Sequence, residues 1–93
     1  MLDRIGRLDA QLGAFITVTA DRALDQAGAA TDRLARRGGD PDDLPALLGV
    51  PTAIKDLTAT AGVRTTHGSR AFASHVPGAD AHVVTVAGPL ARW

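Results

Sequence analysis

The decapeptide Leu47-Leu48-Gly49-Val50-Pro51-Thr52-Ala53-Ile54-Lys55-Asp56 places one lysine at the end of an otherwise apolar run. A stretch rich in small and hydroxylated residues follows it, Gly62-Val63-Arg64-Thr65-Thr66-His67-Gly68-Ser69, and such loops commonly carry sites. The apolar run has no clear helical period, and Pro51 lacks a backbone donor, so we expect an edge-like or irregular strand from Leu47 to Ile54. Lys55 is then either a solvated side chain or a catalytic base.

Helices are expected on the N-terminal side of this run. The first should end at Gly13, because apolar residues recur at helical spacing before it, at Leu2, Ile5, Leu8 and Leu12. Residues 14–19 are rich in β-branched side chains and predict a short strand or extended segment. A second helix is expected from about Ala20 to Arg37, before the Gly38-Gly39 pair, with one face formed by Leu24, Ala27, Thr31 and Leu34.

On the C-terminal side, residues 59–77 show little periodicity, so we expect a loop with one short helical turn. Asp80 can cap a last helix, which Gly88-Pro89 halts. The residues expected to share a face of this helix are Ala81, Val84 and Ala87.

Composition limits what the chain can do. Its 93 residues form one small domain at most, and only 3% are aromatic, so the core should be thin and the chain marginally stable alone. Zero net charge disfavours nucleic acid and anionic membranes as partners. The absence of cysteine and of any long apolar stretch argues against disulfides, a thiolate zinc site and a membrane span, and we expect a cytoplasmic protein.

Other polar residues have simpler interpretations. His67, His75 and His82 lack carboxylate or thiolate companions at ligand spacing, so we predict no metal site. We expect Ser69 to bond nearby backbone groups, and turn geometry accounts for Gly62 and Gly68. The arginines near the end of the second helix, Arg33, Arg36 and Arg37, lie among aspartates and indicate a solvated helix end.

Several blocks together resemble the amidase signature family. They agree with it in order and spacing over roughly Phe15 to Val84, which a single short motif could not establish. The blocks are Leu48-Gly49-Val50-Pro51-Thr52-Ala53-Ile54-Lys55-Asp56, Gly62-Val63, Thr65-Thr66, Gly68-Ser69 and Asp80-Ala81. The resemblance implies an α/β fold, a mixed sheet flanked by helices, of which this chain would be an N-terminal fragment, mostly helical with one or two short strands.

The resemblance also implies a chemistry without a cofactor. In this family a serine attacks an amide carbonyl, a second serine in a cis peptide relays the proton, and a lysine accepts it. Lys55 matches that lysine, and we expect Asp56 to orient the loop. A lysine acts as a base near neutral pH only when burial or cationic neighbours lower its pKa by about three units from about 10.4, which requires a closed site.

The chain departs from the family in lacking both serines. They belong to a downstream Gly-Gly-Ser-Ser-type segment, whereas this sequence has only Ser69 and Ser74, in other settings. We therefore expect residues 1–84 to form a partial amidase domain, followed by a divergent tail over residues 85–93. A truncated, frameshifted or split reading frame would explain this pattern, and the chain alone should be inactive.

Two other roles stay open at this point. The chain could be a non-catalytic subunit or interaction module that pairs with a separately encoded amidase remainder, or a degenerate remnant. The expected partners are a small-molecule amide, once the missing part completes the site, and a complementary amidase polypeptide or a second copy of the chain. The residues give no indication of which amide is the substrate.

Overall fold

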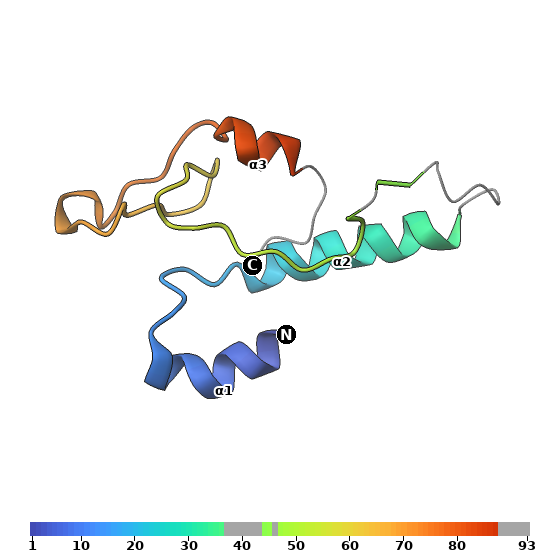
Figure 1. Cartoon of the computed structure of the whole chain (residues 1–93), viewed down its shortest axis with the longest axis horizontal. Coiled ribbons are helices and arrows are strands. Elements are labelled where there is room, and N and C mark those ends of the chain that lie inside the picture. Colours follow the sequence, from blue (N-terminus) through green and yellow to red (C-terminus); the bar gives the residue numbers. More distant parts are fainter. Residues whose placement is uncertain (37–43, 46, 88–93) are drawn as a thin grey trace.

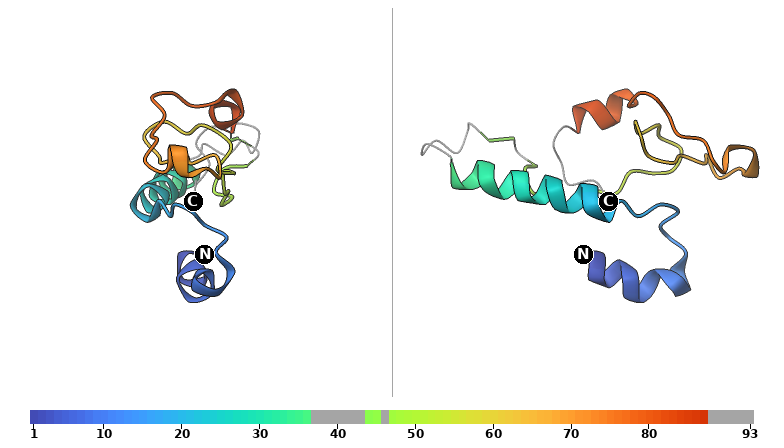
Figure 2. Two further views of the ribbon diagram at one scale, coloured as in Figure 1. Left: turned by 90° about the vertical axis from the view of Figure 1, so that its left-hand side faces the viewer. Right: turned by 180° about the vertical axis from the view of Figure 1, so that it is seen from behind.

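The computed structural model describes residues 1–36, 44–45 and 47–87. Along them lie helix α1 (Leu2–Leu12), helix α2 (Ala20–Ala35), the 3-10 turn η2 (Arg70–Phe72) and helix α3 (His82–Val86). Helices α1 and α3 lie on opposite sides of α2, and residues 50–81 run from beside α2 out to η2 and back to α3 (Figures 1 and 2). The described part of the fold is thus a set of helices joined by long irregular segments.

Helix α1 confirms the prediction made from its apolar spacing. Ile5 is buried, and the helix stops at Gly13, whose left-handed φ of 57° a residue without a Cβ adopts at little cost. The Gly13 N–H donates to the Asp9 carbonyl at 2.7 Å. Asp9 Oδ1 accepts from the N–H groups of Ala14 and Phe15 at 2.8 and 3.0 Å. These two hydrogen bonds fix the path of the chain directly after the helix.

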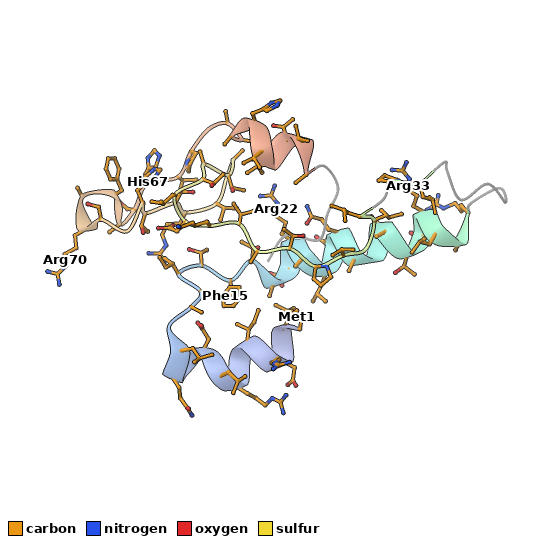
Figure 3. The ribbon with its side chains drawn as sticks, viewed as in Figure 1. Met1, Phe15, Arg22, Arg33, His67 and Arg70 are labelled. Carbon is orange, nitrogen blue, oxygen red and sulfur yellow. The ribbon has the colours of Figure 1, made fainter. Side chains whose placement is uncertain are left out.

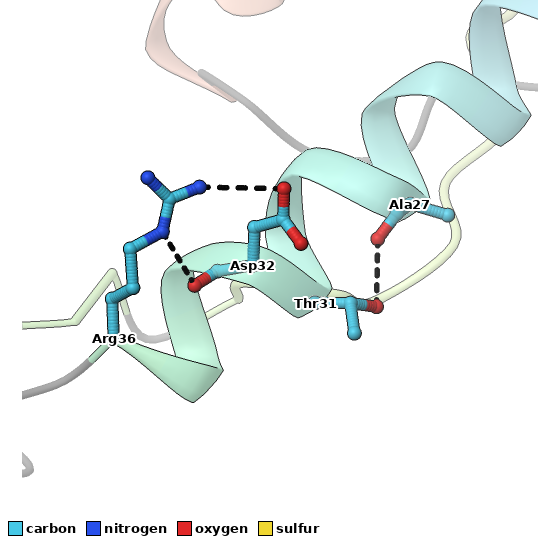
Figure 4. A network of polar contacts seen from close by, with 4 residues as sticks. All are labelled: Ala27, Thr31, Asp32 and Arg36. Atoms are coloured by element: carbon cyan, nitrogen blue, oxygen red, sulfur yellow. Dashed lines mark hydrogen bonds and ion pairs between the residues drawn. The ribbon is translucent and has the colours of Figure 1, made fainter.

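Helix α2 is also confirmed, but its buried face differs from the expected one. Ala23 and Ala30 are buried, whereas Leu24 and Leu34 are exposed. Figure 4 shows the solvated end of the helix, where Arg36 pairs with Asp32 at 3.3 Å and Thr31 Oγ1 donates to a carbonyl one turn earlier. Exposed pairs of this kind contribute little stability. The predicted last residue, Arg37, lies outside the described residues.

The prediction of two strands was wrong for the described residues. No strand forms among the described residues: residues 14–19 are irregular, and the run from residue 47 begins as a turn and contains a single β-bridge residue, Thr52. A strand requires a neighbour to complete its ladder of hydrogen bonds. The carbonyl of Ile16 is instead bonded by an arginine side chain, Arg64. The described residues therefore do not form the mixed sheet that the family resemblance implies.

The C-terminal part agrees with the sequence except at one cap. The loop over residues 59–77 contains one short helical turn, η2, as predicted. The predicted cap of α3 is wrong, because Ala81 is the N-cap and the Asp80 carboxylate accepts instead from the N–H of Ala61 at 2.7 Å. Helix α3 buries Val84, and Gly88-Pro89 lies outside the described residues.

The core is small for a chain of this length. The buried apolar residues are Ile5, Ala23, Ala30 and Val84, of which Val84 has the largest fully buried side chain. The accessible surface is 6367 Å², whereas a compact chain of 9.6 kDa exposes about 5100 Å². The radius of gyration is 14.9 Å against about 12 Å for a compact domain. The helices therefore bury little of one another, and no described helix is long and apolar enough to cross a bilayer.

The burial of Val84 gives a stability prediction. Val84→Ala removes two methyl groups from a side chain that is 0% exposed, and should lower the free energy of unfolding by about 2 kcal/mol. The matched control is Val83→Ala, because Val83 is 61% exposed on the same helix and should change that free energy by less than about 0.5 kcal/mol. Urea unfolding followed by circular dichroism measures both, and equal losses in the two variants would contradict the packing described here.

Candidate active site

Lys55 lies where the irregular run from residue 47 meets a turn. Its carbonyl accepts from the N–H of Thr58 at 2.9 Å, which closes the turn directly after the lysine. The side chain is exposed. Within the described part of the chain, the ammonium group has no hydrogen-bond or ion-pair partner. The amine is therefore available to a molecule that enters from outside.

An open cavity of about 480 Å³ lies beside the lysine. Three stretches of the chain line it: the α1–α2 connection with the first turn of α2, the segment that carries Lys55, and the start of the following loop. The charged and aromatic side chains that line it are Phe15, Arg22, Lys55, Asp56 and Arg64. Five threonines line the cavity with the lysine, at positions 17, 19, 58, 60 and 65, whereas of the stretch over residues 62–69 only Val63, Arg64 and Thr65 line it.

Asp56 is bonded to the loop that follows. Its Oδ1 accepts from the Thr66 N–H at 2.7 Å, and its Oδ2 accepts from Thr66 Oγ1 at 2.5 Å and from the Gly68 N–H at 3.1 Å. The backbone carbonyl of Asp56 accepts from the His67 N–H at 3.2 Å. Two groups of one residue thus hold three consecutive residues of the loop, in agreement with the expectation that Asp56 orients it.

These contacts set the protonation of Asp56. The side-chain hydrogen bond from Thr66 is the main cause that holds the pKa of Asp56 below its ordinary value of 3.8, followed by the Thr66 N–H. Partial burial acts in the opposite direction, whereas the Gly68 N–H and the nearby His67 ring lower the pKa further. Near neutral pH the residue is a carboxylate that accepts hydrogen bonds.

Two arginines that line the cavity join separate segments of the chain through hydrogen bonds to backbone carbonyls. Arg22 extends from α2 toward the loop, where Nη1 donates to the carbonyl of Ala61 at 3.1 Å (Figure 3). Arg64 Nη2 donates to the carbonyl of Ile16 at 2.6 Å, and its Nη1 donates to that of Ala73 at 3.3 Å. The sequence analysis missed both roles, because an arginine that bonds distant carbonyls leaves no local pattern. The sequence analysis also missed the hydrogen bond from the Thr66 hydroxyl to Asp56, which leaves no local pattern either.

The serines and histidines do not contribute catalytic groups to the cavity. Neither Ser69 nor Ser74 lines it, and the Ser69 side chain accepts from the Ala71 N–H at 3.3 Å, which confirms its predicted structural role. The rings of His67 and His75 each contact Phe72 edge to face, at centroid distances of 5.3 and 5.8 Å, and their own centroids lie 6.0 Å apart. The described residues contain no cluster of three or more side chains that could hold a metal ion.

The family model for Amidase matches residues 1–87. The chain belongs to the amidase family. This confirms the family that the sequence blocks around Lys55 indicated. The amidase-family chain is 52% identical over 86 residues to a glutamyl-tRNA(Gln) amidotransferase subunit of Desulforapulum autotrophicum, and the match covers 92% of this chain and 16% of that protein. It is 51% identical over 85 residues to the same subunit of Aromatoleum aromaticum, with 91% and 16% covered.

A solved structure also resembles this amidase-family chain. It is described as an unexpected vestigial protein complex that reveals the evolutionary origins of an s-triazine catabolic enzyme. The TM-score is 0.83 at 35% identity, over 98% of this chain and 20% of the other. Both kinds of relative are therefore several times longer, and the chain spans 16% of the length of the two curated relatives.

The contacts of Asp56 predict a titration. Because its pKa is lower in the folded chain than in the unfolded one, the carboxylate contributes stability that is complete above pH 3.8 and is lost as the pH falls through the lowered value. Thr66→Val removes the strongest donor and should move the Asp56 midpoint upward, toward 3.8. The pH dependence of the Asp56 carboxyl ¹³C shift measures this.

Thr65→Val is the matched control for that titration. The Thr65 hydroxyl donates to the Val63 carbonyl at 3.1 Å and makes no contact with Asp56, so the Asp56 midpoint should stay at the wild-type value. An equal shift in the two variants would mean that the loop responds to any change at these threonines rather than to the loss of the donor.

Proposed function

We propose that this chain supplies the base-bearing part of an amidase that cleaves carbon–nitrogen bonds. Lys55 is the base in this proposal, and the single observation that carries it is the position of Lys55 on an open cavity, at a turn fixed by its neighbour Asp56. Family membership supports the reaction class. The attacking serine and the relay serine belong to polypeptide that this 93-residue sequence does not contain.

The proton path follows from the chemistry of a Ser-Ser-Lys arrangement. The nucleophilic serine attacks the amide carbonyl and passes its proton to the relay serine, which passes its own proton to the lysine amine. The proton then returns to the leaving nitrogen, and water hydrolyses the acyl-enzyme. Lys55 can accept a proton only as a neutral amine, and burial disfavours the ammonium form. In the described residues Lys55 is exposed, so the proposed base requires further polypeptide to cover the cavity.

The mixed sheet of the family fold also requires further polypeptide, which would supply the neighbouring strands. We infer that residues 14–19 and the run from Leu47 to Ile54 become sheet strands when neighbouring strands are present, since both stretches carry β-branched residues and the second already has a bridge residue at Thr52. Residues 1–84 are then the first part of an amidase domain, and residues 85–93 a divergent tail. The reaction requires no metal or cofactor in this proposal.

A chimera tests the role of Lys55. The matching segment of the Desulforapulum autotrophicum protein would be replaced by this chain, and ammonia release from simple amides, glutamine included, would be measured. The chimera should be active and the chain alone inactive. Lys55→Ala should lower kcat of the chimera by a factor of about 100 or more, the usual contribution of a positioned base.

Arg70→Ala is the control in the same chimera. Arg70 lies on η2 and points away from the remainder of the described fold, so its removal should leave kcat unchanged (Figure 3). Full activity of the Lys55→Ala chimera, or ammonia release by the chain alone, would refute the proposed base.

The second candidate function is a non-catalytic subunit that pairs with a separately encoded amidase polypeptide. The amount of exposed apolar surface favours it. Large apolar side chains are exposed on all three helices, including Leu12 of α1 at 70%, Leu24 of α2 at 57% and Val86 of α3 at 69%. Another polypeptide that packs against these helices would bury such side chains. The curated relatives are themselves named as subunits.

Self-association of the isolated chain tests this surface. Sedimentation should show dimers or larger species at micromolar concentration, because the exposed apolar side chains bury one another when no other partner is present. The double variant Leu24→Asp/Val86→Asp should shift the chain toward monomer, whereas Asp25→Ser, at an exposed polar position of α2, should leave the distribution unchanged. A wild-type monomer that melts cooperatively would contradict the expectation.

A further inference from the structure

The turn over residues 66–68 is bonded to the lysine segment through Asp56, while the His67 ring contacts Phe72 and His75 on its other side. All four contacts are donated by the turn: two N–H groups and a hydroxyl to the carboxylate, and the His67 N–H to the Asp56 carbonyl. A carboxylate that accepts several donors makes charge-assisted hydrogen bonds, which are stronger than neutral ones. Asp56 is therefore the principal attachment of this turn to the segment that carries Lys55.

The geometry of the turn indicates that this attachment opposes a local preference. His67 has a φ of 53° and Gly68 a φ of 67°, so two consecutive residues are left-handed. Glycine adopts this conformation readily, whereas a histidine does so at a cost. His67 is the one non-glycine residue with positive φ in the described chain. Such a residue persists where its surroundings hold it, and here the His67 N–H is bonded to Asp56.

The lysine is fixed through its backbone rather than through its side chain. The Lys55 carbonyl accepts from Thr58, and the next residue is clamped to residues 66–68, so the peptide between Lys55 and Asp56 is restrained on both sides. The amine itself has no partner among the described residues. The direction in which the Lys55 side chain leaves the backbone therefore depends on the contacts of its neighbour.

We propose that Asp56 is a positioning residue that fixes the backbone of Lys55, and so aims the amine into the cavity, by anchoring the turn at residues 66–68. The proposal rests on the proposed function in assigning Lys55 the role of base. Asp56 touches no reacting atom in this arrangement. Its carboxylate acts through Thr66 and Gly68, and its loss would leave the lysine present but poorly directed.

The experiment uses the fact that Lys55 is the sole lysine of the sequence. Selective ¹⁵N,¹³C-lysine labelling of the full 93-residue chain gives one backbone N–H and one Cα–Hα signal, whose residual dipolar couplings report the orientation and order of this residue. Asp56→Asn keeps the shape of the side chain but places an NH₂ group or a neutral oxygen where the charged oxygens accept. The Lys55 couplings should fall to less than half of their wild-type values.

Asp80→Asn is the matched control. Asp80 also accepts from a loop N–H, that of Ala61 at 2.7 Å, but its contact lies elsewhere in the loop. The Lys55 couplings should keep their wild-type values in this variant. Equal loss in the two variants would show general loosening of the loop, and unchanged couplings in Asp56→Asn would also overturn the proposal.

A second pair of variants decides the question if Asp56→Asn does not fold. Thr66→Val removes one donor to the carboxylate, whereas Thr66→Ser retains it. The Lys55 couplings should be reduced in Thr66→Val and restored in Thr66→Ser. Reduction in both, or in neither, would contradict positioning through this hydroxyl.

Kinetics of the chimera separate this proposal from the proposed function. Asp56→Asn should lower kcat at least tenfold with KM unchanged, because the substrate still binds and the base is misdirected. If the Lys55→Ala chimera keeps its activity, the assignment of the base fails while the dipolar couplings still report on positioning. If Asp56→Asn keeps wild-type couplings while Lys55→Ala is inactive, the positioning role alone fails.

Discussion

The carboxylate of Asp56 is the interaction on which the arrangement around the cavity depends. One short side chain gathers two N–H groups and a hydroxyl from residues that follow ten to twelve positions later. Among the described residues, the hydrogen bonds that join residues 66–68 to the lysine segment are all made by Asp56. The lowered pKa of Asp56 reflects the same contacts, since every donor that holds the turn through the carboxylate also favours the ionised form.

The rest of the structure relies on polar contacts to a similar degree, because its apolar core is small. Asp9, Arg22, Arg64 and Asp80 each bond backbone groups in irregular parts of the chain, at places where a larger domain would use packed side chains or strand ladders. A hydrogen bond contributes only about 1 kcal/mol net, so such contacts fix geometry better than they supply stability. The small core is consistent with the extended shape and with the exposed leucines and valines.

Local signals in the sequence predicted the local features. The end of α1 at Gly13, the body of α2 and the short turn η2 were predictable because a helix and its cap are decided within a few residues. The strands predicted at residues 14–19 and 47–54 are absent from the described residues, because a strand forms only beside another strand. The predicted cap of α3 was wrong for a related reason: the Asp80 carboxylate accepts from the N–H of Ala61, nineteen residues earlier, and Ala81 is the N-cap. At the candidate site, Lys55 and Asp56 were proposed from the family blocks, whereas the contacts of Arg22, Arg64 and Thr66 run across the fold and leave no local pattern.

The position of Lys55 and the exclusion of water around it have different physical causes. The positions of Lys55 and its cavity are set by hydrogen bonds within residues 14–75, which need no further polypeptide. The reactivity of a lysine base is set differently, by exclusion of water, and this requires apolar walls that a thin core does not supply. For the base proposed at Lys55, placement thus depends on contacts within this chain, whereas activation depends on the polypeptide that covers the open side of the cavity. In the two-polypeptide arrangement proposed above, the lysine segment is positioned before assembly, and the amine becomes a base only when the cavity closes.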